Sequence, residues 1–271
     1  MMTSAVPHRR VDSMNKQPTR TITLVTSLSI CIAAFTGCSS AYTGPATTQE
    51  REIDTVNAVE LDTSGELIVT RGEHVGLTVT AGERVIDRLT SDVEDEVLHL
   101  GLDGEPLAWG GDIRYELTIP TLDAVTVLGS GDAEVDFTGA AEPMVLVQGS
   151  GSVRASGIKA DVASITVNGS GSITVDHIDV QELTTKIDGA GAVAASGTTA
   201  TQDVEIRGSG EYQAEDLQST DARIEVRGSG MADVLISGTL DALIDGSGEI
   251  RYSGDPKIKE EISGSGKVIS R

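Results

Sequence analysis

A glycine triplet recurs along the second half of the chain at nearly constant spacing. Gly-Ser-Gly, or once Gly-Ala-Gly, occurs eight times at intervals of 18 to 20 residues. The glycines of these triplets are Gly129, Gly131, Gly149, Gly151, Gly169, Gly171, Gly189, Gly191, Gly208, Gly210, Gly228, Gly230, Gly246, Gly248, Gly264 and Gly266. Such regular self-similarity is typical of proteins that stack one small unit on the next. The repeat therefore predicts an extended array of similar units.

The residues around each triplet alternate between aliphatic and polar side chains. Two positions before the triplet the residue is always Val or Ile, as in Val147, Val167 and Ile187. The alternation resumes after the triplet, and alternation with a period of two predicts strands that bury one face. A second glycine, as in Ser156-Gly157, often lies about half a repeat further on. Each repeat is therefore predicted to be one flattened coil of two strands and two turns.

These features predict an all-β fold, a parallel β-helix or β-solenoid with about 20 residues per coil. Equivalent strands of successive coils would pair about 4.8 Å apart. A narrow interior suits a chain with 3% aromatic residues. The triplet glycines are interpreted as structural, because reversing the chain in three residues requires positive φ. A phosphate-binding loop is the competing interpretation, but such loops precede a helix, and here strands follow every triplet.

Residues 51–271 are predicted to form a single solenoid domain, with irregular coils over 51–120 and the triplet repeats over 121–271. The first part contains four alternating segments, expected as strands: 66–70, 75–80, 97–102 and 113–119. Ile86, Leu89 and Val93 have helical spacing and indicate one short helix at most. Charged residues at 257–261 replace core residues of earlier coils and are expected to cap the far end.

The N-terminal segment has the layout of an export signal. A basic region is followed by an apolar run from Ile22 to Phe35 and then by Thr36-Gly37-Cys38. The last three residues resemble a bacterial lipobox, so residues 1–37 are predicted to be a lipoprotein signal peptide and Cys38 a lipidation site. A plain secretory signal with an incidental cysteine is the alternative, and Met14 is a second candidate start. Residues 38–50 are interpreted as a flexible tether.

The overall charge restricts the partners of this chain. Its formal net charge is −22, and it becomes −25 when residues 1–37, with four basic residues and one acidic residue, are removed. Nucleic-acid binding requires clustered Lys and Arg, so nucleic acid is not expected as a partner. The expected partners are a membrane, through the lipid anchor, and an extracellular protein or glycan. The expected location is the bacterial cell membrane or outer membrane, facing the extracytoplasmic side.

The chain offers few residues for catalysis. His74, His99 and His177 are scattered and show no metal-ligand spacing, and no cysteine follows Cys38. No catalytic residue, resident metal or cofactor is therefore predicted. Clustered aspartates hold Ca²⁺ in solenoid polysaccharide lyases, and the corresponding candidates here are Asp132, Asp136, Asp176 and Asp179. Trp109, the single tryptophan, is a candidate ligand contact, with a hydrophobic plug over an end coil as the alternative.

The chain resembles the putative auto-transporter adhesin, head GIN domain family. The resemblance rests on the eight triplets and on the preceding strand that ends in proline, Tyr115-Glu116-Leu117-Thr118-Ile119-Pro120, and it spans about Ile53 to Val268. It implies a right-handed parallel β-helix, often in exported lipoproteins, without the catalytic residues of pectate lyases. The expected function is adhesion or cell-envelope interaction by a non-enzymatic surface lipoprotein. A carbohydrate-binding or degenerate polysaccharide-lyase-like module is the alternative.

Overall fold

The structure is a computed structural model that describes residues 43–104 and 111–271. The predicted signal peptide, Cys38 and Trp109 lie outside the described residues. Within those two ranges, no helix has both the length and the apolar character needed to cross a membrane.

Nineteen strands and one 3₁₀ helix make up the described part of the chain. The N-terminal elements are β1 (Ala46–Arg51), β2 (Ala58–Leu61), β3 (Glu66–Arg71), β4 (Gly76–Gly82), η1 (Ile86–Arg88), β5 (Leu89–Glu94), β6 (Val97–Leu102) and β7 (Arg114–Ile119). The shorter strands of the repeat region are β8 (Ala124–Gly129), β9 (Asp132–Asp136), β10 (Met144–Gly149), β11 (Ser152–Ser156), β12 (Lys159–Gly169), β17 (Glu249–Ser253), β18 (Lys257–Gly264) and β19 (Lys267–Ser270). The longer ones are β13 (Ser172–Gly189), β14 (Ala192–Gly208), β15 (Glu211–Gly228) and β16 (Met231–Gly246).

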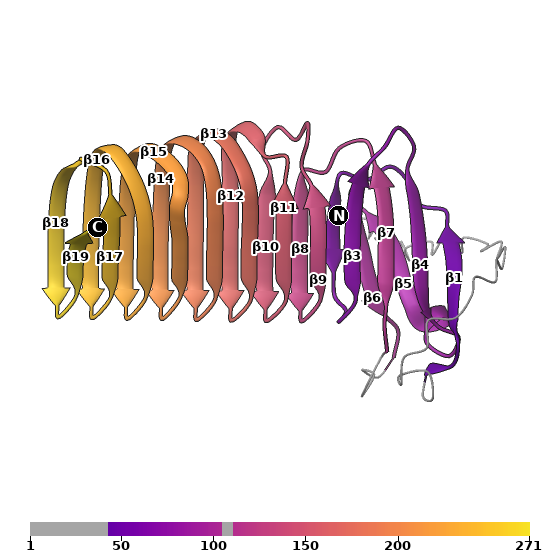
Figure 1. Cartoon of the computed structure of the whole chain (residues 1–271). Helices are drawn as coiled ribbons and strands as arrows, with labels where there is room; N and C mark the ends of the chain where they lie inside the picture. Colours follow the sequence, from indigo (N-terminus) through magenta and orange to yellow (C-terminus); the bar gives the residue numbers. More distant parts are fainter. Residues whose placement is uncertain (1–42, 105–110) are drawn as a thin grey trace, which may run out of the picture.

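The repeats stack as a parallel β-solenoid, which confirms the predicted fold class (Figure 1). One wall, called the pre-triplet wall, contains the residues before each triplet, from β8 and β10 to the second half of β16 and β18. The other, the post-triplet wall, contains the residues that follow, from β9 and β11 to β17 and β19. Both walls are built from parallel pairs in which every triplet lies over the preceding one.

The aliphatic residues form continuous columns inside the solenoid, as the alternation predicts. Val147 pairs with Val167, and Val167 pairs with Ile187 in the next coil. All three side chains are fully buried. Tyr212 also lies inside, where its hydroxyl donates to Gln202 Oε1 at 2.9 Å, and burial raises the pKa of this phenol. Burial of these columns supplies the hydrophobic stabilisation of an aromatic-poor chain.

The two glycines of a triplet are required for different reasons. Gly169, the first of its triplet, has φ +129°, a conformation that L side chains rarely adopt. Gly171, the second, has no room for a side chain, because a Cβ there would lie 2.5 Å from both Gly151 O and Val147 Cγ1. The turns are also hydrogen-bonded to each other, since the residue between these glycines donates its N–H to Gly149 O at 2.8 Å.

The second turn agrees with the sequence prediction in some coils and differs in others. Gly139, Gly157 and Gly254 lie in turns between two strands, as predicted. From β13 to β16, strands of 16 to 18 residues run from one triplet to the next and bend over a rounded arch (Figure 1). The ladder shifts register in this arch, for example between Val175 and Ile178. In these coils a half-repeat glycine such as Gly197 marks a bulged bend in a long strand, because a bulge absorbs curvature while most ladder hydrogen bonds are kept.

The N-terminal coils do not stack in chain order. β2 lies between β6 and β8 on one wall, and β3 lies between β7 and β9 on the other, all in parallel pairs. Beyond them the pairing becomes antiparallel, with β5 next to β6 and β4 between β7 and β1. The four predicted strands correspond to β3, β4, β6 and β7.

Two predictions for the N-terminal region need correction. The predicted helix is only η1, and Leu89 and Val93 belong to β5, because pairing with β6 overrides the weak helical spacing. The predicted tether of residues 38–50 is structured at its end, because 46–50 belong to β1 and pair with β4. Thr43 is already buried against the fold.

The two ends of the solenoid are built differently. At the β1 end, Arg51 Nη1 donates to Leu89 O at 2.8 Å and to Ser91 Oγ at 2.7 Å, and Nη2 donates to Ile86 O at 3.0 Å. This side chain therefore links β1 to β5 across the end, and its burial lowers the pKa of the guanidinium. At the β18 end, the predicted charged cap leaves aliphatic groups accessible. Ile258 and Ile262 are each 40% exposed.

Candidate functional site

The post-triplet wall carries two hollows that share Thr174 and lie one after the other along the solenoid. Each has a volume of about 220 Å³. The first spans β3, β9, β11 and β13, and the second spans β13, β14 and β15. We call the two together the acidic trough. Its outward-facing lining residues are Glu66, Asp132, Glu134, Ser152, Arg154, Ser172, Thr174, Asp176, Ala194, Ser196, Gln213, Glu215 and Asp216.

The chemistry of the acidic trough follows from the outward positions of the repeat. Small residues such as Ser152, Thr174 and Ser196 occupy its middle, because outward side chains are not needed for the core and can be short. Six carboxylates line it, three in each hollow; Arg154 is the one basic side chain among the lining residues, and Arg114 of β7 pairs with Glu66 at 2.6 Å. The trough therefore offers hydroxyl groups between two negatively charged rims, a surface suited to hydrogen bonding and to positive charge.

The four aspartates proposed as Ca²⁺ ligands do not form one site. Asp132 accepts a hydrogen bond from Ser152 Oγ, and Asp136 accepts from Thr138 N–H at 2.9 Å. Asp179 accepts from Lys159 Nζ at 2.7 Å, and Asp176 lines the second hollow. No group of three or more metal-ligating side chains comes together within residues 43–104 and 111–271. The aspartates are separated because they belong to different coils and corners.

The three histidines also lie apart. His99 Nδ1 is 3.1 Å from Glu60 Oε1 on the neighbouring strand of the pre-triplet wall. His177 lies in an arch with φ +60°, and its backbone N–H donates to Ser196 Oγ at 3.3 Å. His74 is exposed in the turn before β4. The geometry gives no nucleophile–base pair among these histidines.

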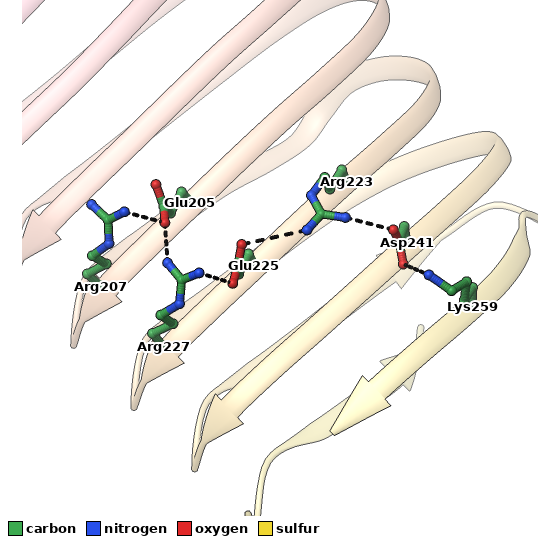
Figure 2. A network of polar contacts seen from close by, with 7 residues as sticks. All are labelled: Glu205, Arg207, Arg223, Glu225, Arg227, Asp241 and Lys259. Atoms are coloured by element: carbon green, nitrogen blue, oxygen red, sulfur yellow. Dashed lines mark hydrogen bonds and ion pairs between the residues drawn. The ribbon is translucent and has the colours of Figure 1, made fainter. Parts of the chain in front are cut away.

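The pre-triplet wall carries a ladder of charges that crosses coils (Figure 2). Glu205 binds both Arg207, at 2.6 Å, and Arg227 of the next coil. Arg227 also binds Glu225. The ladder continues from Arg223 through Asp241 to Lys259, with N–O distances of 2.9 and 3.2 Å. Because the basic groups are 44% to 74% exposed, each pair contributes little to stability, and the ladder mainly keeps this wall solvated.

A separate cluster of three charged side chains lies near the last coils of the post-triplet wall. Asp233 is 5% exposed and lies 2.9 Å from Arg271 Nη2 and 3.8 Å from Arg251 Nη1. Desolvation raises the pKa of this carboxyl, and the two guanidinium groups partly oppose that effect. The contact links β16 to the chain beyond β19. It is interpreted as structural, because both arginines shield Asp233 from solvent.

The fold and the two walls define a class of non-globular β proteins, the β-solenoids. Within that class, the chain belongs to the family described as "Putative auto-transporter adhesin, head GIN domain", whose model matches residues 56–256. The match spans most of the chain, so the resemblance recognised in the triplets is confirmed. A comparison with curated proteins gives no match.

Solved structures share the fold over most of their length. A "putative lipid binding protein" from Parabacteroides distasonis ATCC 8503 is similar with 25% identity and a TM-score of 0.75, covering 84% of this chain and 97% of that chain. A "putative adhesin" from the same strain has 21% identity and a TM-score of 0.75, with 84% and 98% covered. A "putative adhesin" from Parabacteroides merdae ATCC 43184 has 22% identity and a TM-score of 0.73, with 84% and 97% covered. Family and neighbours carry the names of adhesins or lipid-binding proteins and not of enzymes, and the family name indicates a surface or extracellular protein.

Proposed function

We propose that the protein is a non-enzymatic, lipid-anchored surface protein whose rigid solenoid serves adhesion or cell-envelope interaction. The proposed binding surface is the acidic trough, and the proposed partner is an extracellular glycan or protein. The observation that carries this proposal is the trough itself, in a chain that belongs to an adhesin-like family. It is open, runs across several coils and offers hydroxyl and carboxylate groups in rows.

The chemistry of the trough supports this choice over the opposite wall. On the pre-triplet wall, Glu205, Glu225 and Asp241 are already paired with basic side chains of their own or neighbouring coils. In the trough, Glu66 is paired with Arg114 of β7 at 2.6 Å, and Arg154 is the one basic lining side chain for the other five carboxylates. Unneutralised carboxylates attract cationic groups and accept hydrogen bonds from sugar hydroxyls. A partner therefore gains more binding free energy on the post-triplet wall than on the pre-triplet wall.

The test places a bulky positive charge in the middle of the trough. Thr174 borders both hollows, so Thr174→Lys narrows both and adds a cation at their junction. Thr166→Lys makes the same change on the pre-triplet wall and is the matched control. Binding to glycan arrays and to isolated cell envelopes should fall at least tenfold for Thr174→Lys and stay unchanged for Thr166→Lys. Equal effects of both variants would exclude the trough as the binding surface.

The proposed anchor has a separate test. Cys38→Ala removes the acylated thiol, so the protein should move from the membrane fraction to the soluble fraction after cell breakage. Ser39→Ala, next to it, is the control and should leave the protein with the membranes. Continued sedimentation of Cys38→Ala with membranes would exclude lipidation at this residue and would leave the trough proposal untouched.

The lyase-like alternative predicts turnover. A Ca²⁺-dependent lyase assay on acidic polysaccharides, with Asp132→Asn and Asp176→Asn as variants, separates it from simple binding. Product formation that is lost in either variant would favour the lyase-like module over the adhesive one.

A further inference from the structure

The last coil of the solenoid gathers the accessible aliphatic side chains of the molecule. Of the five large apolar side chains that are exposed within residues 43–104 and 111–271, three belong to this coil: Ile258, Ile262 and Ile269. One coil earlier the equivalent residues Leu240 and Ile244 are 1% and 2% exposed. Ile258 and Ile262 are therefore interior positions of the solenoid that no further coil of the described chain covers.

The backbone of the last coil is also open on one side. β18 pairs with β16, and β19 pairs with β17, and in the described chain neither strand has a neighbour beyond (Figure 1). An exposed strand edge with apolar groups is a template for pairing with another strand. Native solenoids need a polar cap at such an end, and here the charged residues replace only part of the core.

We propose that this end binds a second copy of the same chain, end to end and around a two-fold axis. In this contact, β18 of one protomer pairs antiparallel with β18 of its partner, and the axis passes through Glu260. A two-fold contact uses the same surface twice and closes after two copies. The result is a dimer in which two solenoids share one continuous pre-triplet wall.

The sequence of β18 selects this register. With Glu260 on the axis, Ile258 lies opposite Ile262 of the partner subunit on the interior face. On the outer face, Lys259, which also binds Asp241 of its own chain at 3.2 Å, lies opposite Glu261 of the partner subunit. Every register centred on Lys259, Glu260 or Glu261 has a like-charged pair on the axis, but moving the axis to Lys259 or Glu261 also places an isoleucine opposite Glu260. The register centred on Glu260 is the one that pairs apolar with apolar and positive with negative at the same time.

The β1 end of the solenoid is a poor binding surface for the β18 end of a second copy. Arg51 covers it by binding two carbonyl oxygens and Ser91 Oγ, and its edge strands β1 and β5 run antiparallel to their neighbours. None of the five exposed large apolar residues lies in that part of the described chain. Head-to-tail stacking would therefore place the polar β1 end, whose backbone groups are already bound by Arg51, against the aliphatic β18 end.

The register leaves one unfavourable contact, which makes the proposal testable. Glu260 occupies the interior position that Ala242 holds one coil earlier, so the two Glu260 side chains face each other on the axis between the isoleucine pairs, and like charges there are destabilising. Glu260→Gln removes that repulsion, whereas Glu261→Gln removes the attraction to Lys259 of both strands. The two substitutions remove the same charge from adjacent residues, and each is the matched control of the other.

Sedimentation velocity of the full chain in detergent, over a concentration series, measures the effect. One coil end buries little area, so a weak dimer is expected. Glu260→Gln should tighten the dimer about fivefold and Glu261→Gln should loosen it about fivefold. A monomer at all concentrations, oligomers larger than a dimer, or two substitutions acting in the same direction would each overturn the proposal.

A cysteine on the axis provides a second, independent measurement. In a background that carries Cys31→Ser and Cys38→Ser, Glu260→Cys should form a disulfide-linked dimer under mild oxidation, because the two copies of an axial residue face each other. Glu261→Cys should not, since its partner position is Lys259. Equal cross-linking at both positions, or none at either, would contradict the two-fold register.

Discussion

The two ends of the solenoid solve the same problem in different ways. Any stack of coils leaves two open edges, each with exposed backbone groups and uncovered core residues. At the β1 end, the pairing turns antiparallel and Arg51 satisfies carbonyl oxygens across the opening. At the β18 end, parallel pairing simply stops, and Ile258 and Ile262 remain 40% exposed.

This difference shows that a repeat sequence does not by itself provide an end. The β1 end required residues that break the pattern: a coil order that differs from the chain order, two antiparallel edge strands and a bridging arginine. The β18 end kept the repeat and changed single residues, such as Glu260 in place of Ala242. The end is closed where the chain departs strongly from its repeat, at β1, and it stays open where only single residues change, at β18.

The largest loss of stability is expected for a glycine substitution in a middle coil, and the same substitution at the open end is the comparison. Gly228→Val should lower the free energy of unfolding by about 4 kcal/mol, because Gly228 has φ +126° and a Cβ would overlap Gly208 O. Gly264→Val meets the same obstacle with φ +119°, but only the last coil needs to detach. Urea unfolding should therefore show a loss of about 1 kcal/mol for Gly264→Val. Similar losses for both variants would contradict the difference between middle and end.

A second prediction compares two equivalent core positions. Ile244→Ala should cost about 3 kcal/mol, because Ile244 is 2% exposed and the substitution leaves a cavity. Ile262 pairs with it in the next coil but is 40% exposed, so Ile262→Ala should cost about 1 kcal/mol or less. Thermal and urea unfolding of both variants measure the ratio. Both variants are measured at concentrations where the chain is monomeric, and equal costs there would contradict the difference in exposure between the two positions.

A third prediction concerns the closed end, where the leading substitution has a smaller effect than Gly228→Val or Ile244→Ala. Arg51→Ala removes the hydrogen bonds to Leu89 O and Ile86 O and should cost about 2 kcal/mol. Amide hydrogen exchange should become faster in β1 and β5 and stay unchanged in β16 and β18. Arg88→Ala, which removes a side chain bound to Asp103 O, is the control for losing an arginine near this end. Faster exchange along the whole solenoid would show that Arg51 stabilises the entire fold and not only the β1 end.

The regular part of the fold could be predicted from the sequence because its local and global signals agree. The eight triplets, the aliphatic residues two positions before them and the alternation that follows all specify the same coil, as Val147, Val167 and Ile187 show. The arches were predicted less well. A glycine such as Gly157 signals a bend, but whether the strand breaks or bulges there depends on neighbouring coils.

The N-terminal region and the surface were harder to predict. The insertion of β2 and β3 between other coils depends on long-range pairing that leaves no periodic trace. The acidic trough escaped sequence analysis for a related reason. Its residues are outward positions of different coils, and Thr174 becomes the junction of two hollows only after the coils are stacked. A column-by-column alignment of outward positions would have shown the row of small residues.

The stacking also makes the height of the molecule adjustable in fixed steps. β1 and β18 lie at opposite ends, so the distance between the two ends is set by the number of coils between them (Figure 1). Gaining or losing one triplet unit would change that distance by about 4.8 Å and leave both terminal structures intact. The number of triplet units therefore sets the length of this protein, and one whole unit is the step by which that length can change.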